Sequence, residues 1–289
     1  MRSVKNNTAI LLLSCHDQKG LIYKITRFIF KHKGNIVQLN EHVDKSDNVF
    51  FFRVEWEMEG FEISENDIES TLKKTLFDSY HMYWELYFSN HTPKMALFAS
   101  QNTHCTYDIL SRYFSNEWNV NIPVIFSNRH SHQELAKKYG IEFYHFDLEG
   151  RTKAEVEQEQ LSILQEMNVD FIVLARYMQI LTGNFLKSFN KKIINIHHSF
   201  LPAFAGAMPY HRAFERGVKI IGATSHYVTE DLDEGPIIAQ SVVDVSHKDS
   251  IDDLKRKGRD IEKLVLSKAI HLHLHRKVLT YKNRTIIFD

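Results

Sequence analysis

Five short apolar runs recur along the last two thirds of the chain and constrain its fold more than any other feature. They lie at 95–99 (MALFA), 122–126 (IPVIF), 142–146 (EFYHF), 171–175 (FIVLA) and 192–196 (KIINI). Residues with helical spacing lie between them, as in 156–167, and a further helix is expected near 177–189. Short buried strands that alternate with helices predict an α/β domain with a twisted, mainly parallel sheet. Strands at 219–228 and 236–243, a long helix at 252–275 and a hairpin at 279–288 complete the expected elements.

The first ninety residues follow a different pattern. Apolar strand-like segments are expected at 9–13, 36–43, 49–55 and 82–88. One helix carries Leu21, Ile25, Phe28 and Ile29 on one face, and a second begins after Ser64. The order βαββαβ predicts a ferredoxin-like antiparallel sheet with two helices on one face.

These two patterns predict two domains. We expect an N-terminal domain at 1–88, a linker at 89–94 (SNHTPK) and a second domain at 95–289. A chain of 289 residues with 43% hydrophobic residues is long enough to bury both cores.

The charge balance and the cysteines narrow the class of partner. Lys plus Arg and Asp plus Glu both count 36, so nothing favours nucleic acid or a membrane surface, and a small-molecule partner is expected. Cys15 and Cys105 are expected to be free thiols in a reducing compartment. The apolar stretch near the N-terminus is too short for a signal peptide or a membrane span, which favours a cytoplasmic protein.

Histidines are numerous but scattered. The 17 histidines include His271, His273 and His275 in the long helical segment, where only the first and last share a face. Two ligands make an incomplete zinc site, so we interpret these residues as exposed helix-surface histidines and expect no metal.

One strand end and one turn carry the residues suited to chemistry. In open α/β sheets ligands bind at the carboxyl ends of strands, where Asn195 and His197 lie two apart and project to the same face. An amide donor and a histidine suit a tetrahedral oxyanion intermediate. Asp233, in the turn-like LDEGP at 232–236, could orient the imidazole. The alternative is that all three residues are turn formers or structural groups.

The segment 195–240 is similar to the formyltransferase family, which includes glycinamide ribonucleotide transformylase and methionyl-tRNA formyltransferase. The resemblance implies catalytic roles for Asn195, His197 and Asp233. Other positions that match the family are Ser199, Leu201, Pro202, Gly222, Thr224 and His226.

Over nearly its whole length the chain resembles the formyltetrahydrofolate deformylases, which join an ACT domain to a Rossmann-like formyltransferase domain. The segment 17–21 (DQKGL), followed by Ile25, Ile29 and Gly34, resembles the ACT motif, and 255–266 (KRKGRDIEKLVL) matches the deformylases. The resemblance implies hydrolysis of 10-formyltetrahydrofolate to formate and tetrahydrofolate, which serves one-carbon balance and the formate supply for purine synthesis. No cofactor is implied besides this folate substrate.

The segment 175–182 (ARYMQILT) resembles the folate-binding segment of the family. The resemblance implies that Met178, Gln179 and Leu181 bind the substrate through their backbone groups. The alternative is a helix start that packs Met178 and Leu181 into the core.

The choice of water as acceptor depends on residues 100–105 (SQNTHC), which follow the first strand of the second domain. Glycinamide ribonucleotide transformylase has a glycine-rich phosphate loop there, whereas this stretch has no glycine, and a backbone cradle for phosphate generally needs one. Water is therefore the expected acceptor, and Cys105 is expected to pack rather than react. Formyl transfer to an amine such as glycinamide ribonucleotide, and a non-catalytic amino-acid or folate sensor, remain alternatives.

The resemblance also implies a homo-oligomer, a dimer or tetramer, in which the N-terminal domains pair. An amino-acid effector such as methionine or glycine is implied at this domain. The alternative is a packing or dimerisation module that binds nothing.

Overall fold

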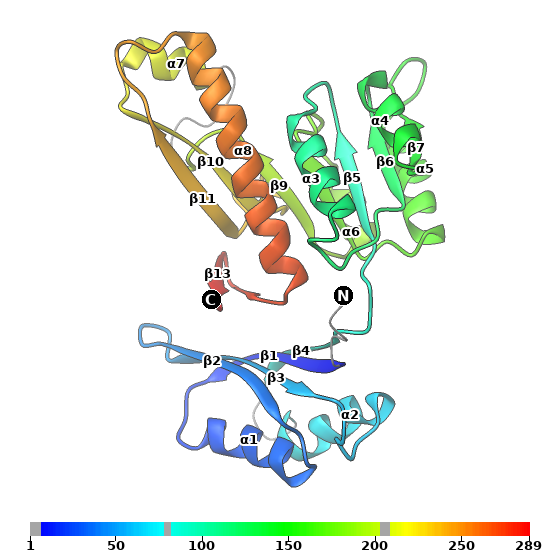
Figure 1. Cartoon of the computed structure of the whole chain (residues 1–289), viewed down its shortest axis with the longest axis vertical. Helices are drawn as coiled ribbons and strands as arrows, with labels where there is room; N and C mark the ends of the chain where they lie inside the picture. The colour runs from blue at the N-terminus through cyan, green and yellow to red at the C-terminus, as the bar shows by residue number, and fades with distance from the viewer. Residues whose placement is uncertain (1–6, 78–81, 203–208) are drawn as a thin grey trace. The chain divides into compact units, whose positions relative to one another are not determined.

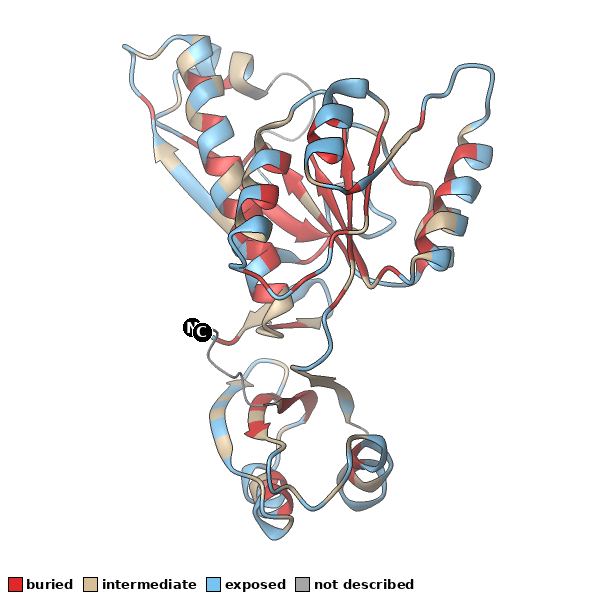
Figure 2. Ribbon diagram, turned by 45° about the vertical axis from the view of Figure 1, so that its right-hand side comes forward, coloured by how far each residue is buried: buried red, intermediate tan, exposed pale blue. Residues whose placement is uncertain are grey.

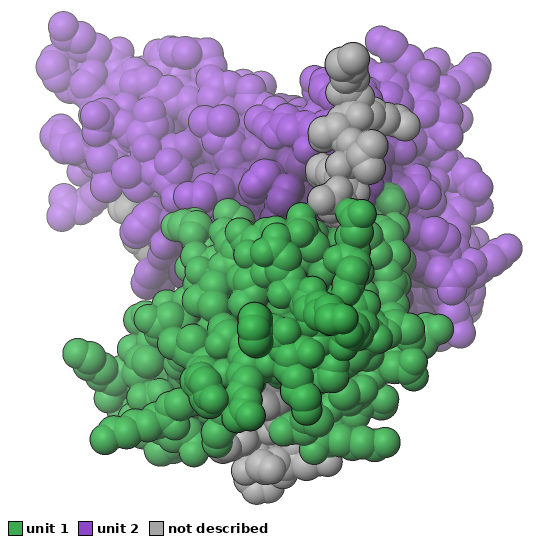
Figure 3. All heavy atoms as spheres, turned by 60° about the horizontal axis from the view of Figure 1, so that its bottom comes forward, with its two compact units in different colours: residues 1–92, 276–279, 286–289 green, residues 93–275, 280–285 purple. Residues whose placement is uncertain are grey.

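The structure is a computed structural model of the chain. It describes residues 7–77, 82–202 and 209–289. The chain forms two compact units, coloured separately in Figure 3. Unit 1 comprises residues 1–92 with Arg276–Leu279 and Ile286–Asp289, and unit 2 comprises Pro93–His275 with Thr280–Thr285.

Unit 1 contains an antiparallel sheet with two helices. Its elements are β1 (Thr8–His16), α1 (Leu21–Lys31), β2 (Ile36–Asp44), β3 (Val49–Glu57), α2 (Glu65–Leu72), a π-helical turn η1 (Lys73–Phe77) and β4 (Tyr83–Phe88). The strand order is β2-β3-β1-β4, and every neighbouring pair is antiparallel. Figure 1 shows α1 and α2 on the same face of this sheet. The predicted βαββαβ order is confirmed.

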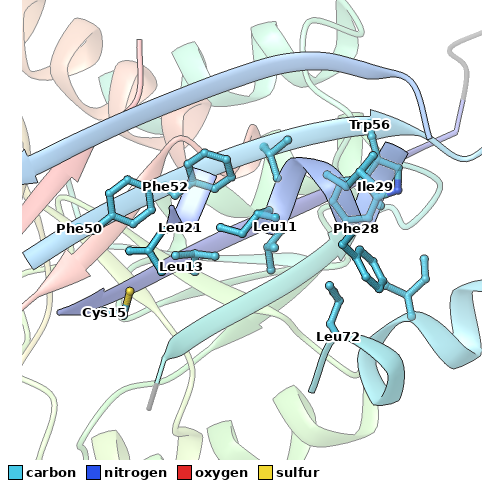
Figure 4. Close-up of a cluster of buried hydrophobic side chains, with 14 residues drawn as sticks. Leu11, Leu13, Cys15, Leu21, Phe28, Ile29, Phe50, Phe52, Trp56 and Leu72 are labelled. Carbon is cyan, nitrogen blue, oxygen red and sulfur yellow. The ribbon is translucent and has the colours of Figure 1, made fainter. Parts of the chain in front are cut away.

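The core of unit 1 lies between the sheet and its helices. Alternate residues of β1, among them Leu11 and Leu13, meet Phe52 and Trp56 of β3 and the apolar face of α1 (Figure 4). The strand period of two sends these side chains to one face, while helical spacing gathers Ile25 and its neighbours opposite them. This burial supplies the main driving force for folding of the unit.

The other face of the β1–β3 pair meets the end of the chain. Arg53 in β3 is 2% exposed, and its Nε donates to the carbonyl of Arg276 at 3.0 Å. Its two remaining nitrogens donate to Gln38 and to Glu55. The guanidinium of Arg276 lies 3.9 Å from the ring centre of Tyr87. The C-terminal segment is therefore part of the packing of unit 1.

Unit 2 is built on a seven-stranded sheet of order β11-β10-β9-β8-β5-β6-β7. Its strands are β5 (Met95–Ala99), β6 (Val124–Ser127), β7 (Glu142–His145), β8 (Phe171–Ala175), β9 (Ile193–His197), β10 (Ile220–Tyr227) and β11 (Ile237–Asp244). Its helices are α3 (His104–Phe114), η2 (His130–His132), α4 (Gln133–Lys138), α5 (Lys153–Glu166), α6 (Gly183–Phe189), α7 (Pro209–Arg216) and α8 (Ile251–Leu274). A hairpin of β12 (Val278–Tyr281) and β13 (Arg284–Ile287) follows.

The sheet of unit 2 is mainly parallel, as predicted. Strands β9, β8, β5, β6 and β7 run parallel, and β10 is antiparallel to both β9 and β11. Figure 2 shows the strands buried and the outer faces of the helices exposed. The chain proceeds from β5 to one side and returns to β8 on the other, so the strand order reverses between β5 and β8. Ligands bind at such reversals, outside the carboxyl ends of the strands.

Three expectations are corrected by the structure. The helix expected near 177–189 begins only at Gly183, because Thr182 has an extended backbone and its hydroxyl caps the amide of Phe185. The run at 122–126 forms a strand only from Val124, after Pro123, which lacks a backbone donor. His273 is buried rather than exposed, and its Nδ1 lies 2.9 Å from the hydroxyl of Tyr227.

In the described parts of the chain no helix is both long and apolar enough to cross a membrane. Cys15 and Cys105 are both free and buried, as expected.

Candidate active site

A pocket of about 420 Å³ lies at the carboxyl ends of β8 and β9, where it is bounded by the loop from β10 to β11. All six residues predicted for the site line it: Met178, Gln179, Leu181, Asn195, His197 and Asp233. Residues that are up to 55 positions apart in the chain therefore meet in one cavity. Their chemical roles stay predictions.

His197 is held by one ring nitrogen and leaves the other unpaired. Its Nδ1 lies 3.2 Å from Oδ2 of Asp233, and its side chain is 9% exposed. Its Nε2 is buried without a hydrogen-bond partner among the described residues. A buried unpaired nitrogen is costly, so this geometry suits a group that meets a ligand. The carboxylate can stabilise the protonated ring while Nε2 acts on that ligand.

Asn195 and His226 face each other because β9 and β10 are antiparallel. The register places His226 opposite Asn195, and Asn195 Nδ2 lies 3.2 Å from His226 Nε2. His226 Nδ1 lies 3.0 Å from the carbonyl of Tyr227, which can only accept, so Nδ1 carries a hydrogen. In the neutral ring Nε2 then accepts from Asn195. In the protonated ring it can donate to Asp233 Oδ1, 3.7 Å away.

Asp233 lies between the two imidazoles. Hydrogen bonds with His197 and then with His226 hold the pKa of the Asp233 carboxyl well below its usual range, against the opposing effect of burial. The carboxylate is therefore ionised at neutral pH. A fixed negative charge at this point can accept hydrogen bonds from both imidazoles.

A tight turn brings Asp233 to this position. Its backbone φ is +59°, in the left-handed region, and Gly235 follows two residues later. A Cβ at Gly235 would lie 1.8 Å from the carbonyl oxygen of Tyr227. The amide of Tyr227 also donates to the carbonyl of Pro236 at 2.9 Å. Only glycine permits this close approach between the turn and the end of β10.

The chain after His197 is fixed by the hydroxyl of Thr224. This buried hydroxyl donates to the carbonyl of Ser199 and accepts from the amide of Leu201 and from Nε2 of Gln240. Gln240 also donates to the carbonyl of Leu201 at 2.9 Å. Every hydrogen-bonding position of the Thr224 oxygen is thereby used, which locks the exit of β9 against β10 and β11.

The segment predicted to bind folate is an irregular strip, neither helix nor strand, rather than a helix start. Met178 is 60% exposed, so the alternative of core packing is wrong for Met178, whereas it holds for Leu181, which is buried in the main cluster of unit 2. The amide of Met178 donates to the hydroxyl of Ser100 at 3.0 Å. At the far end, the amide and hydroxyl of Thr182 both donate to the buried carboxylate of Glu157. Both ends of the strip are fixed.

Arg176 and His198 form the wall beside His197. Arg176 has φ +60°, and its Nε lies 3.4 Å from the carboxylate of Glu262. His198 stacks on His197 with ring centres 5.1 Å apart. Burial, and then the positive charges of Arg176 and His197, lower the pKa of His198 to about 4. His198 is therefore neutral at pH 7.

Glu262 is the centre of a buried network that includes three side chains of the kinds that bind metal ions. His104 Nε2, Cys105 and Glu262 offer ligand atoms within 4.8 Å of one another. However, Glu262 is already bound by His104 at 2.8 Å and Tyr210 at 2.9 Å, and a guanidinium stands beside it. Burial and the charge of Glu262 raise the pKa of the Cys105 thiol, so it stays protonated. The donor set suits an ion-pair network better than a cation.

Sequence reasoning gave no role to His226, Arg176, His198 or Glu262. In the sequence, His226 only matches a position of the family pattern and has no assigned function. An antiparallel pairing of β10 with β9 would have indicated a role for His226, because this pairing places His226 opposite Asn195. Glu262 lies on α8, 67 residues after Asn195, and no local pattern connects it with the pocket.

The family model and the similar proteins of known name agree with one another. The family model described as Formyl transferase matches residues 93–270. A formyltetrahydrofolate deformylase of Synechocystis sp. is 47% identical over 285 residues, which cover 99% of this chain and 100% of that protein. The formyltetrahydrofolate deformylase of Escherichia coli is 42% identical and covers 96% of this chain and 97% of its own length.

Two solved structures resemble this chain over different shares of its length. A crystal structure of a formyltetrahydrofolate deformylase from Pseudomonas syringae pv. tomato has a TM-score of 0.96 at 37% identity, covering 100% of this chain and 96% of that one. Glycinamide ribonucleotide transformylase 1 from Symbiobacterium toebii has a TM-score of 0.66 at 32% identity. It covers 71% of this chain and 98% of that chain.

The turn at Gly235 generates a first prediction. Gly235→Ala should displace the turn from Tyr227, destabilise the protein by about 1–3 kcal/mol, and weaken the contact between Asp233 and His197. Urea unfolding gives the first effect, and NMR titration of the Asp233 carboxyl gives the second as a pKa that moves up towards its usual range. Gly183→Ala is the control, because its Cβ would meet nothing closer than 3.9 Å. Equal behaviour of the two variants would contradict the role of the turn.

A second prediction concerns pH. Burial lowers the pKa of both His132 and His198 to about 4, from 6.5. Between these values the unfolded chain binds more protons than the folded one, so stability should fall as pH drops from about 6.5 towards 4. Urea unfolding at pH 7 and pH 5 measures the slope. His132→Gln and His198→Gln should each reduce it, and an unchanged slope in both would refute the assignment.

Proposed function

The chain belongs to the formyl transferase family, and we propose that it hydrolyses 10-formyltetrahydrofolate to formate and tetrahydrofolate. The observation that carries the proposal is His197, held by Asp233 on one nitrogen and open to the pocket on the other, with Asn195 two residues away on the same strand. The near full-length similarity to proteins named formyltetrahydrofolate deformylase supports water as the acceptor. The reaction serves one-carbon balance and the formate supply for purine synthesis, and we place it in the cytoplasm.

In the proposed mechanism, a water molecule attacks the formyl carbon and gives up one proton. The new C–O bond produces a tetrahedral oxyanion, to which the Asn195 amide and the protonated His197 donate hydrogen bonds. The bond between the formyl carbon and N10 then breaks, N10 takes up the proton that the water gave up, and the released formic acid loses its own proton to the solvent and leaves as formate. Asp233 stabilises the protonated imidazole and orients both ring and water. The atoms balance with water and the folate alone, so we propose no cofactor and no metal.

His226 is a positioning residue in this scheme. Its Nε2 lies within hydrogen-bond distance of the Asn195 amide and 3.7 Å from Asp233, so it couples the orientation of the donor to that of the carboxylate. Because His226 is 2% exposed, water cannot readily replace it. The donor amide is therefore held in place before the oxyanion forms, which is the condition under which such donors are most effective.

The folate is proposed to lie along the strip formed by Met178, Gln179 and Leu181. These residues border the same cavity as Asn195 and His197, so a pterin bound there can present its formyl group to both. The exposed side chain of Met178 and the neighbouring Ile180, which is 61% exposed, offer apolar surface to an aromatic ring. Main-chain contacts remain the proposed source of specificity for the pterin.

Formate release measured without any added amine separates the three candidate functions. Hydrolysis predicts stoichiometric formate and tetrahydrofolate from 10-formyltetrahydrofolate and water. A transferase would need an amine, and a sensor would bind folate without turnover. The hydrolytic proposal fails if clean protein binds the folate and releases no formate.

Loss of the amide donor should be severe. Asn195→Ala should reduce turnover about a hundredfold or more while the fold is retained, since one oxyanion donor contributes about 3 kcal/mol. Steady-state formate release, with circular dichroism as the check on folding, measures this. Turnover near that of the wild type would exclude Asn195 as an oxyanion donor.

Removal of the charge at Asp233 should affect turnover more than binding. Asp233→Asn should lower kcat by at least tenfold with a smaller change in KM, because the carboxylate acts mainly on the protonated imidazole of the transition state. Asp231→Asn is the matched control, since Asp231 lines the same pocket but is exposed. If both variants lose equal amounts of binding and of turnover, this role of Asp233 is wrong.

For unit 1 we propose an ACT-like module that pairs between subunits of a dimer or tetramer and binds an amino acid such as methionine or glycine. Strand β2 is an edge strand, and its Val37 and Leu39 are 50% and 38% exposed. Phe30 on α1 is 81% exposed. Apolar side chains along an unpaired strand edge favour pairing with a second copy. Formate release with and without methionine and glycine tests the effector.

Charges on this edge should break the oligomer. Val37→Lys with Leu39→Lys should shift the molar mass in light scattering towards that of one chain of 34.0 kDa, because two lysines on each edge repel the other copy. Leu264→Lys, at an exposed apolar position on α8, is the control. A mass that stays multimeric in the double variant would contradict pairing through β2.

A further inference from the structure

A second pocket of about 410 Å³ adjoins the proposed active site. It shares two wall residues with the first pocket, Arg176 and His198. Its other walls include His104 at the first turn of α3, and Lys255 and Arg259 on α8. The proposed mechanism uses none of the residues that belong only to this second cavity.

The two pockets carry opposite charge. Arg176, Lys255 and Arg259 face the second pocket together with one carboxylate, Glu262, so its formal balance is +2 with histidines neutral. The first pocket also has Arg176 but carries the carboxylates Glu230, Asp231 and Asp233, for a balance of −2 with histidines neutral and −1 with His197 protonated as in the proposed mechanism; Glu230 is in addition ion-paired with Lys187 at 3.2 Å. The wall between the two cavities is therefore a boundary between a region that repels anions and one that attracts them.

Glu262 does not cancel the attraction for anions. Burial pushes its pKa upward, but the hydrogen bond from His104 and the charge of Arg176 hold it below its usual value, so it is ionised and already compensated. Tyr210 occupies its second oxygen. Lys255 has an ion pair with the exposed Asp252 at 3.1 Å, which leaves Arg259 as the more available cation. Arg259 is exposed at the pocket, and its Nε contacts only weakly the carbonyl of Lys255, at 3.4 Å.

We propose that the second pocket is a binding and exit site for the small carboxylate product, so that formate leaves the active site past Arg176 and His198 towards Arg259 and Lys255. The inference rests on the proposed hydrolysis, which generates formate, an anion at neutral pH, beside Asp233. Repulsion by the three carboxylates of the first pocket and attraction by the cations of the second act on that anion in the same direction. The folate, which occupies the first pocket, does not have to leave first.

The neutral state of His198 fits this route. A protonated imidazole at the boundary would bind formate at the wall and slow its passage, whereas a neutral ring presents a polar group without a net charge. Arg176, the one cation common to both pockets, is paired with Glu262 and so attracts the anion less than an unpaired guanidinium would. The strongest available attraction then lies further out, at Arg259.

Product inhibition by sodium formate tests the proposal. Total ionic strength is held constant with sodium chloride, and acetate and inorganic phosphate are measured in parallel. In the wild type formate should inhibit. In Arg259→Gln and Lys255→Gln the inhibition constant for formate should rise about threefold each, and in Arg259→Glu about tenfold, with KM for the folate unchanged within twofold. Arg256→Gln, which removes an exposed cation of α8 outside the pocket, should change nothing.

The outcomes separate the two proposals. Formate release without inhibition by formate, or inhibition constants that are equal in wild type and the Arg259 and Lys255 variants, would overturn the exit site and leave hydrolysis intact. An equal rise of the inhibition constant in Arg256→Gln would also overturn the exit site, since the inhibition would then depend only on the overall charge of α8. Stronger inhibition by phosphate than by formate would overturn the exit site as well, because the pocket would then select a phosphorylated ligand. Absence of formate release in the wild type would overturn the proposed function itself.

Discussion

One ionised carboxylate between two imidazoles sets the requirements that the surrounding structure meets. Asp233 contacts His197 on β9 and His226 on β10, and a half-buried charge of this kind is tolerated only where hydrogen bonds compensate it. To reach that position the chain needs a left-handed residue, a glycine against the Tyr227 carbonyl, and two antiparallel strands in one register. The Thr224 hydroxyl then fixes the segment that leaves β9. Stability and site geometry depend here on the same few contacts.

Much of this arrangement could be predicted from sequence because it follows short-range periodicity. The apolar runs identified the parallel strands, and a spacing of two at the end of β9 placed Asn195 and His197 on one side. The partners of these residues could not be predicted in the same way. His226 meets Asn195 only because β10 reverses direction and pairs in one particular register, and a shift by one residue would send its ring to the other face. No pattern within β10 specifies that direction.

The helix expected near 177–189 shows a second reason for failure. Apolar spacing alone extended the helix towards Tyr177, but the left-handed backbone at Arg176 and the cap at Thr182 belong to tertiary contacts with Glu262 and Glu157. The same reason applies to the end of the chain. Arg53 lies in a strand rich in apolar residues, and nothing near it in sequence indicates that the carbonyl of Arg276 is its buried partner. Contacts between residues 25 or more positions apart overrode local preference in both places.

Arg176 connects the strain of the backbone with the distribution of charge. A non-glycine residue with φ +60° costs of order 1–3 kcal/mol, and it persists only where the surroundings determine it. Here the side chain is drawn to Glu262 on one side of the wall while the backbone leads into the strip that lines the other pocket. A relaxed backbone at this position would move either the cation away from Glu262 or the strip away from Asn195. The contacts that hold Arg176 in this conformation therefore keep one residue common to both cavities, and they place the change from negative to positive charge beside His197.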